Sequence, residues 1–135
     1  MRAESREASR TIDIPGAAGE LLDKIAILNI KARRIDDPEK VVNVRRELAL
    51  LTAKRDESGL ARAGLAPLEA ELAVVNEKLW DVEDEIRLRE KAGDFGERFV
   101  ALARAVYVTN DRRAAIKREI NRRCNSSIVE EKHYA

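Results

Sequence analysis

The strongest periodic signal in the chain is a heptad repeat in its middle. Six apolar residues recur there at alternating spacings of four and three, namely Leu68, Leu72, Val75, Leu79, Val82 and Ile86. This spacing places all six on one side of a helix, as a seam for a second helix. Gly93 follows in a turn of a few residues, where it suits the left-handed position after a helix. Residues 95–123 then continue with apolar residues at helical spacing, so we predict an antiparallel pair of long helices, 67–91 and 95–123.

Two further helices are predicted before this hairpin. Residues 17–34 are apolar almost all the way round, which predicts the most buried helix of the protein. Residues 38–57 begin with Pro38, which is favoured at a first helical position, after Asp37 as the capping residue. Residues 60–66 are expected to form a loop or a frayed turn. The charged fraction of 38% and the aromatic fraction of 4% favour slender helices with narrow apolar stripes. The predicted fold is all-α, with three to four long helices in antiparallel hairpins.

The two ends of the chain differ from this pattern. Residues 1–10 are polar and predict a disordered N-terminal arm, which leaves 11–135 as a single helical domain. Residues 11–15 alternate between polar and apolar and end in a proline, as a short strand does. We expect Ile12 and Ile14 to pair with Ile128 and Val129 in a minor two-stranded ribbon.

The charge balance and the single cysteine limit the partners. Lys and Arg number 26 against 25 Asp and Glu, so no overall field favours nucleic acid or a membrane as a partner. No apolar run approaches the roughly 20 residues of a membrane span, and residues 1–10 contain no signal-peptide core. Cys124 is the only cysteine, which excludes an intramolecular disulfide and suits a reducing cytoplasm. We therefore predict a cytoplasmic protein without a metal or a cofactor.

Catalytic motifs are absent from the sequence. It contains no phosphate-binding glycine loop, no nucleophile elbow and no paired-histidine zinc motif. The pairs Glu20-x-x-Asp23 and Glu83-Asp84 are similar to carboxylate pairs that hold magnesium in all-α pyrophosphohydrolases. However, the paired motifs such a site requires are missing. Whether the protein is an enzyme stays open.

Polar residues that interrupt or flank the apolar seams are the candidate site residues. They are Lys24, Asn76, Glu83, Arg87, Asn110, Arg113 and Lys117. Folding the hairpin about Gly93 brings Asn76 level with Asn110 and Arg113. One interpretation is a set of solvated flanking positions, with an asparagine that sets the register of the helices. The other is a polar site for an anionic ligand, with Arg113 as a planar fork, Lys117 and Lys24 as point charges, and the asparagines as orienting groups.

Four stretches of the sequence support a family resemblance. They are Gly19-Glu20-Leu21-x-Asp23-Lys24-Ile25, Asn76-x-x-Leu79-Trp80-x-x-Glu83-Asp84, Tyr107-x-x-Asn110-Asp111-x-Arg113 and Glu130-Glu131-Lys132-x-Tyr134. Together they resemble an uncharacterised family of short bacterial and phage proteins, known only as a domain of unknown function. The resemblance covers residues 14–134 and implies one helical domain, without supplying an activity. Because its signature falls largely on polar positions, it raises the ligand-site interpretation to near parity with the structural one.

Two functions remain open from the sequence. The first is a helical interaction or assembly module of a bacterial or phage cytoplasm. The second is a binding protein or enzyme with a polar pocket for a phosphate- or carboxylate-bearing small molecule. The 38–57 helix carries an apolar seam of its own, from Val41 to Leu51, which one hairpin does not cover. We therefore also expect a homodimer.

Overall fold

The protein is built of α-helices, with non-helical segments at both ends of the described chain. In residues 10–128 and 130–133, which the computed structural model describes, there are four α-helices. They are α1 (Ala18–Arg34), α2 (Pro38–Glu57), α3 (Ala66–Ala92) and α4 (Glu97–Arg123), with a short 3-10 helix, η2 (Leu60–Ala63), between α2 and α3. The all-α prediction is confirmed, and each helix begins and ends within two residues of the expected position.

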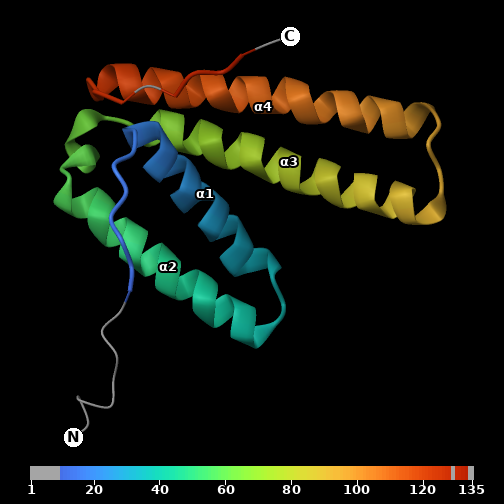
Figure 1. Ribbon diagram of the computed structural model, residues 1–135, viewed down its shortest axis with the longest axis horizontal. Helices are drawn as coiled ribbons and strands as arrows, with labels where there is room; N and C mark the ends of the chain where they lie inside the picture. Colours follow the sequence, from blue (N-terminus) through green and yellow to red (C-terminus); the bar gives the residue numbers. More distant parts are fainter. Residues whose placement is uncertain (1–9, 129, 134–135) are drawn as a thin grey trace, which may run out of the picture.

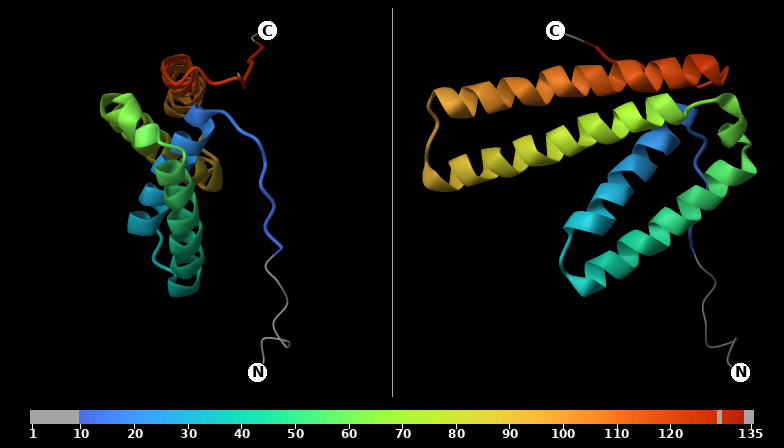
Figure 2. Two further views of the ribbon diagram at one scale, coloured as in Figure 1. Left: turned by 90° about the vertical axis from the view of Figure 1, so that its left-hand side faces the viewer. Right: turned by 180° about the vertical axis from the view of Figure 1, so that it is seen from behind.

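The helices form two antiparallel hairpins, α1–α2 and α3–α4 (Figure 1). Helix α1 lies against one end of the longer α3–α4 hairpin and contacts all three other helices. The two hairpins then diverge, so the turn between α3 and α4 projects away from α1 and α2, as the reverse view also shows (Figure 2). More than two helices therefore pack together only at the end of the α3–α4 hairpin opposite its turn.

Local chemistry explains the turn at the tip of the α3–α4 hairpin. Gly93 takes a left-handed conformation with φ 67°, which a residue with a side chain adopts only at a cost. The Asp94 amide donates to the carbonyl of Arg89 at 2.9 Å and so satisfies the end of α3. The Asp94 carboxylate in turn accepts from the Gly96 amide at 3.2 Å. This turn delays the start of α4 from the predicted residue 95 to Glu97.

The core sits where α1, α3 and α4 meet. Its buried residues are Leu22, Ile25, Leu65, Leu68, Leu72, Val75, Ile116 and Ile120. Burying a Leu or Ile side chain stabilises a fold by about 1.5–3 kcal/mol, so this cluster is the main support of the bundle. Helix α1 has the largest share of buried residues, as predicted, whereas only Val44 of α2 is buried.

The heptad seam of α3 is covered unevenly. Its first four residues are buried, but Val82 and Ile86 are only half-buried. The reason is visible in Figure 1, because beyond this point only α4 lies along α3. Edge-to-face packing of Phe95 on Phe99, with ring centroids 5.2 Å apart, closes the far end.

The predicted terminal ribbon is wrong for the residues that the structure describes. Neither residues 10–17 nor residues 124–128 and 130–133 contain a strand. Ile12 and Ile14 are 79% and 77% exposed, because the first segment crosses α2 and leads away from the helices, while the last runs back along α4 (Figure 1). The alternating pattern has no partner strand within reach. Val129 and the predicted arm at residues 1–9 lie outside the described residues.

Candidate functional site

The site begins with a close approach of α1 to α4 at Gly19. The Gly19 amide donates to Oδ1 of Asn121 at 2.7 Å. A Cβ atom added to Gly19 would lie only 2.6 Å from the carbonyl oxygen of Lys117. The absence of a side chain thus lets the first turn of α1 rest directly on α4. Glu20, the next residue, and Asp23, one turn further along α1, are thereby brought against Lys117 of α4.

Asp23 is a buried carboxylate in the apolar core. Its side chain is 3% exposed, and its Oδ1 accepts from the Asn76 amide at 2.8 Å. Asn76 is held in turn, because its Nδ2 also donates to the carbonyl of Leu72 at 2.9 Å. The guanidinium of Arg113 adds two longer contacts, Nε to Asp23 Oδ2 at 3.6 Å and Nη1 to Asn76 Oδ1 at 3.4 Å. A buried carboxylate needs such partners, since a lone buried charge is strongly unfavourable.

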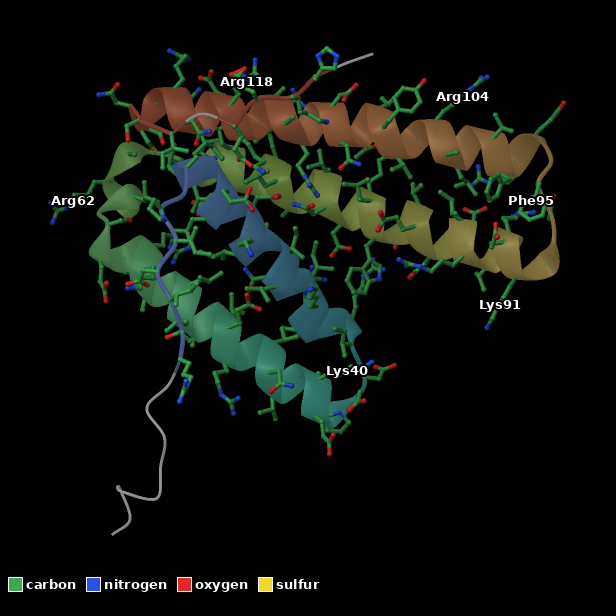
Figure 3. All side chains as sticks on the ribbon, viewed as in Figure 1. Lys40, Arg62, Lys91, Phe95, Arg104 and Arg118 are labelled. Carbon is green, nitrogen blue, oxygen red and sulfur yellow. The ribbon has the colours of Figure 1, made fainter. Side chains whose placement is uncertain are left out.

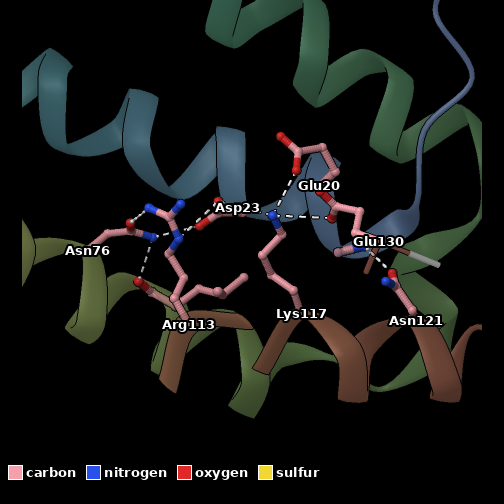
Figure 4. Close-up of polar contacts among 9 residues, drawn as sticks. Glu20, Asp23, Asn76, Arg113, Lys117, Asn121 and Glu130 are labelled. Atoms are coloured by element: carbon pink, nitrogen blue, oxygen red, sulfur yellow. Dashed lines mark hydrogen bonds and ion pairs between the residues drawn. The ribbon is translucent and has the colours of Figure 1, made fainter. Parts of the chain in front are cut away.

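Lys117 is the second cation of the site, and it meets three carboxylates (Figure 4). Its Nζ donates to Glu20 at 2.7 Å and lies 3.2 Å from Glu130 and 3.8 Å from Asp23. Burial alone lowers the pKa of Lys117, but the hydrogen bonds with Glu20 and Glu130 and the charge of Asp23 outweigh it and raise the pKa. The hydrogen bond from Lys117 lowers the pKa of Glu20, against the opposing effect of burial. Both groups are therefore charged at neutral pH.

A cavity of about 340 Å³ opens beside this cluster, between α4 and the C-terminal segment, which we define as residues 126–128 and 130–133. It is lined by Asn110, Arg113, Ala114, Lys117, Arg118, Asn121, Glu130, Glu131 and Lys132. Four of these carry positive charge and two carry negative charge. Arg118 makes no ion pair with any residue that the structure describes; it projects, with Arg104, from the side of α4 that faces away from α3 (Figure 3).

Asn121 is the least satisfied polar group of the cavity wall. The residue is only 4% exposed, and its Oδ1 faces the Gly19 amide. Because that amide can only donate, the Asn121 side chain is oriented with its oxygen toward Gly19 and its NH₂ group turned away. No residue in the described part of the chain accepts a hydrogen bond from this NH₂ group. Buried donors are nearly always paired in folded proteins, so this one indicates a site for an acceptor.

The structure gathers four of the seven residues proposed from the sequence. Asn76, Arg113 and Lys117 belong to the polar cluster, and Asn110 lines the same cavity as Arg113. Lys24 is exposed on α1, with its charge acting on Glu20.

The other two proposed residues lie away from the cavity. Glu83 and Arg87 are exposed further along α3, about 10 and 16 Å from Asn76 at the usual helical rise. Arg87 there faces Asp84 at 3.8 Å. The structure therefore does not bring Glu83 or Arg87 to the cluster.

Sequence reasoning gave too little weight to the carboxylates and to Asn121. Glu20 and Asp23 were considered only as magnesium ligands, and among the described residues no group of three His, Cys, Asp or Glu side chains could hold a metal ion. The available signal was Asp23 itself, a charged residue between Leu22 and Ile25 in the most apolar helix. Glu130 carried no periodic signal, because it lies in a segment without regular structure.

The comparisons with known proteins agree with the resemblance and add no activity. A family model described as a family of unknown function (DUF6165) matches residues 12–135. No curated protein and no solved structure matches the chain. Among the helices that the structure describes, none is both long and apolar enough to cross a membrane.

Proposed function

The chain thus belongs to DUF6165, a family of unknown function, and we propose from its site that it binds a small anionic molecule in the cavity beside α4. The ligand would present a carboxylate or phosphate group to Arg113, Lys117 and Arg118. The observation that carries the proposal is the buried NH₂ group of Asn121, a donor on the cavity wall without an acceptor in the described protein. Leaving such a donor unsatisfied costs about 1–3 kcal/mol, and a ligand oxygen would recover that cost.

The other groups on the wall match the same chemistry. Arg113 has five N–H donors, and its contacts with Asn76 and Asp23 are long, so it retains capacity for a further anion. The Asn110 amide makes no side-chain hydrogen bond with the described residues and lies one turn from Arg113. The volume of the cavity, about 340 Å³, falls at the lower end of the range of small-molecule sites, roughly 300–1,000 Å³.

A ligand screen with matched variants tests this proposal. Thermal-shift and calorimetric titrations would compare inorganic phosphate, succinate, sugar phosphates and nucleotides on the wild type and Arg113→Met. Arg104→Met is the control, since Arg104 is an exposed arginine of the same helix that does not line the cavity. We expect an anion to stabilise the wild type and Arg104→Met but not Arg113→Met. Failure of every anion to stabilise the wild type would refute the proposal.

A second candidate function, an interaction or assembly module, rests on the far half of the α3–α4 hairpin. Beyond the reach of α1 this pair of helices exposes Leu88, Val100 and Val108, three large apolar residues. A homodimer through this region would bury them. Sedimentation equilibrium would test it, and a monomer over a wide concentration range would exclude the dimer.

We propose that the protein acts in a bacterial or phage-infected cytoplasm. The single cysteine, Cys124, supports this location, since a lone thiol suits reducing conditions. Burial raises the pKa of this thiol, so it is protonated at neutral pH. Expression in a bacterial cytoplasm followed by thiol titration should give one reduced cysteine per chain. A disulfide-linked dimer in freshly lysed cells would contradict the assignment.

A further inference from the structure

We infer that the ligand of this cavity carries a carboxylate that takes the place of Glu130 on Lys117, and that its binding releases the C-terminal segment. This inference rests on the proposed function and adds the chemical class of the ligand and the movement that admits it. Its basis is that the protein already places a carboxylate of its own, that of Glu130, against Lys117 (Figure 4), and that both residues line the cavity.

The C-terminal segment contacts α4 through exposed side chains. After α4 the chain turns through Asn125, whose φ is 53°, and the Ser126 amide donates to the carbonyl of Asn121 at 2.9 Å. From there the segment runs back along α4. Its contacts with α4 beyond the turn include two side-chain ion pairs, Glu130 to Lys117 at 3.2 Å and Lys132 to Asp111 at 3.3 Å. The Glu130 side chain is 46% exposed, and ion pairs of this kind contribute little to stability.

Among the carboxylates around Lys117, Glu130 is the one that can leave. Glu20 and Asp23 belong to α1, which is fixed against α4 by the close approach at Gly19. Glu130 belongs to a segment without regular structure and lies on the cavity side of Lys117. Displacing it exposes the ammonium of Lys117 to the cavity without disturbing the packing of α1.

The charge balance of the cluster selects a carboxylate. With Glu130 in place, three carboxylates face the two cations Arg113 and Lys117; when it moves away, two carboxylates remain. A singly charged carboxylate would restore the original balance, and the geometry at Lys117 already accommodates that group. A doubly charged phosphate group would place both of its negative charges at one point beside Glu20 and the buried Asp23, which is unfavourable at short range. Succinate carries its two charges on separate groups, so one carboxylate can take the place of Glu130 while the other extends toward Arg118, which lines the same cavity.

Calorimetric titration with succinate and with inorganic phosphate tests the exchange. Glu130→Gln keeps the size of the side chain but removes the competing charge. We expect it to tighten succinate binding by about two- to fivefold, which corresponds to the loss of one partly exposed ion pair. Glu119→Gln is the control, because it removes the same charge from a half-buried residue of α4 that pairs with Arg122 and Arg123 and does not line the cavity. It should leave the affinity for succinate unchanged.

Limited trypsin digestion gives an independent readout of segment release. Succinate should accelerate cleavage after Lys132 in the wild type, whereas Glu130→Gln should be cleaved rapidly with or without it. If succinate binds but Glu130→Gln weakens it, Glu130 closes on the ligand instead of competing, and the inference is overturned while the proposed function stands. Preference for phosphate over succinate would overturn the assigned ligand class. If neither anion binds any form, the proposed function itself fails.

Discussion

The substitution Gly19→Ala probes the contact on which the whole site depends. The added methyl group would lie 2.6 Å from the carbonyl oxygen of Lys117 and 3.0 Å from Oδ1 of Asn121. Real Cβ atoms essentially never come closer than 3.0 Å, so α1 must move away from α4 by at least about 0.4 Å. Backbone atoms of α4 form the obstacle, and they cannot yield as the end of a flexible side chain can.

The expected loss follows from two opposing effects. Overpacking of a close contact typically costs about 1–3 kcal/mol. Alanine recovers about 0.5–1 kcal/mol in a helix, because glycine loses more backbone freedom on folding. We therefore expect Gly19→Ala to lower the free energy of unfolding by about 1–2 kcal/mol, and Tm by about 4–8 °C for a chain of this size.

Urea and thermal unfolding followed by far-UV circular dichroism would measure this loss. Gly16→Ala is the matched control, since a Cβ at Gly16 meets nothing closer than 3.9 Å. It should leave stability unchanged or raise it slightly. If Gly19→Ala proves as stable as Gly16→Ala, then α1 is not pressed against α4, and the reasoning that places Glu20 and Asp23 at the site is refuted.

Three further predictions concern charge and backbone. Arg113→Met should lower the free energy of unfolding by about 1–3 kcal/mol in urea titrations, because it removes a partner of the buried Asp23 carboxylate; equal or greater stability would mean that Arg113 is not needed to compensate Asp23. The pKa of Glu20 is lowered by Lys117, so the folded protein binds fewer protons and this contribution, present above about pH 4.5, is lost as the pH falls through the lowered pKa. Glu20→Gln should therefore make stability less dependent on pH below 4.5, and an unchanged pH profile would contradict the pairing. Gly93→Ala should cost about 1 kcal/mol in thermal melts because φ there is 67°, whereas Gly93→Asn should cost less; equal stability of all three forms would argue against the left-handed turn.

The helices and their turns were predictable because their signals are local. Asp37 caps α2 by accepting from the Glu39 amide at 3.0 Å, next to the proline expected at the first helical position. Gly93 ends α3 in the conformation that its residue type favours. The prediction of a terminal ribbon was wrong because the alternation in residues 11–15 is only a local pattern. A strand also needs a partner strand, and among the described residues the fold does not bring one to this segment.

The candidate site was predictable only in part. Asn76 and Arg113 were expected to meet, because folding a hairpin about a known turn sets which residues of its two helices lie level. Glu83 and Arg87 share the same side of α3 in the sequence pattern, yet they lie beyond the end of the cavity. Their distances from Asn76 follow from the helical rise within α3. That the cluster forms at Asn76 depends on where α1 crosses the hairpin, which no spacing within α3 encodes.

The sequence by itself determined the helices, their ends and the antiparallel pairing of α3 with α4, since each follows from contacts between residues close in the chain or joined by a short turn. The tertiary structure alone decided that Gly19 rests on Lys117 and Asn121, about a hundred residues away. That contact depends on the angle and depth at which two helices cross, which arise from the packing of the whole core. It is also what carries Asp23 into the interior and leaves the NH₂ group of Asn121 facing the cavity.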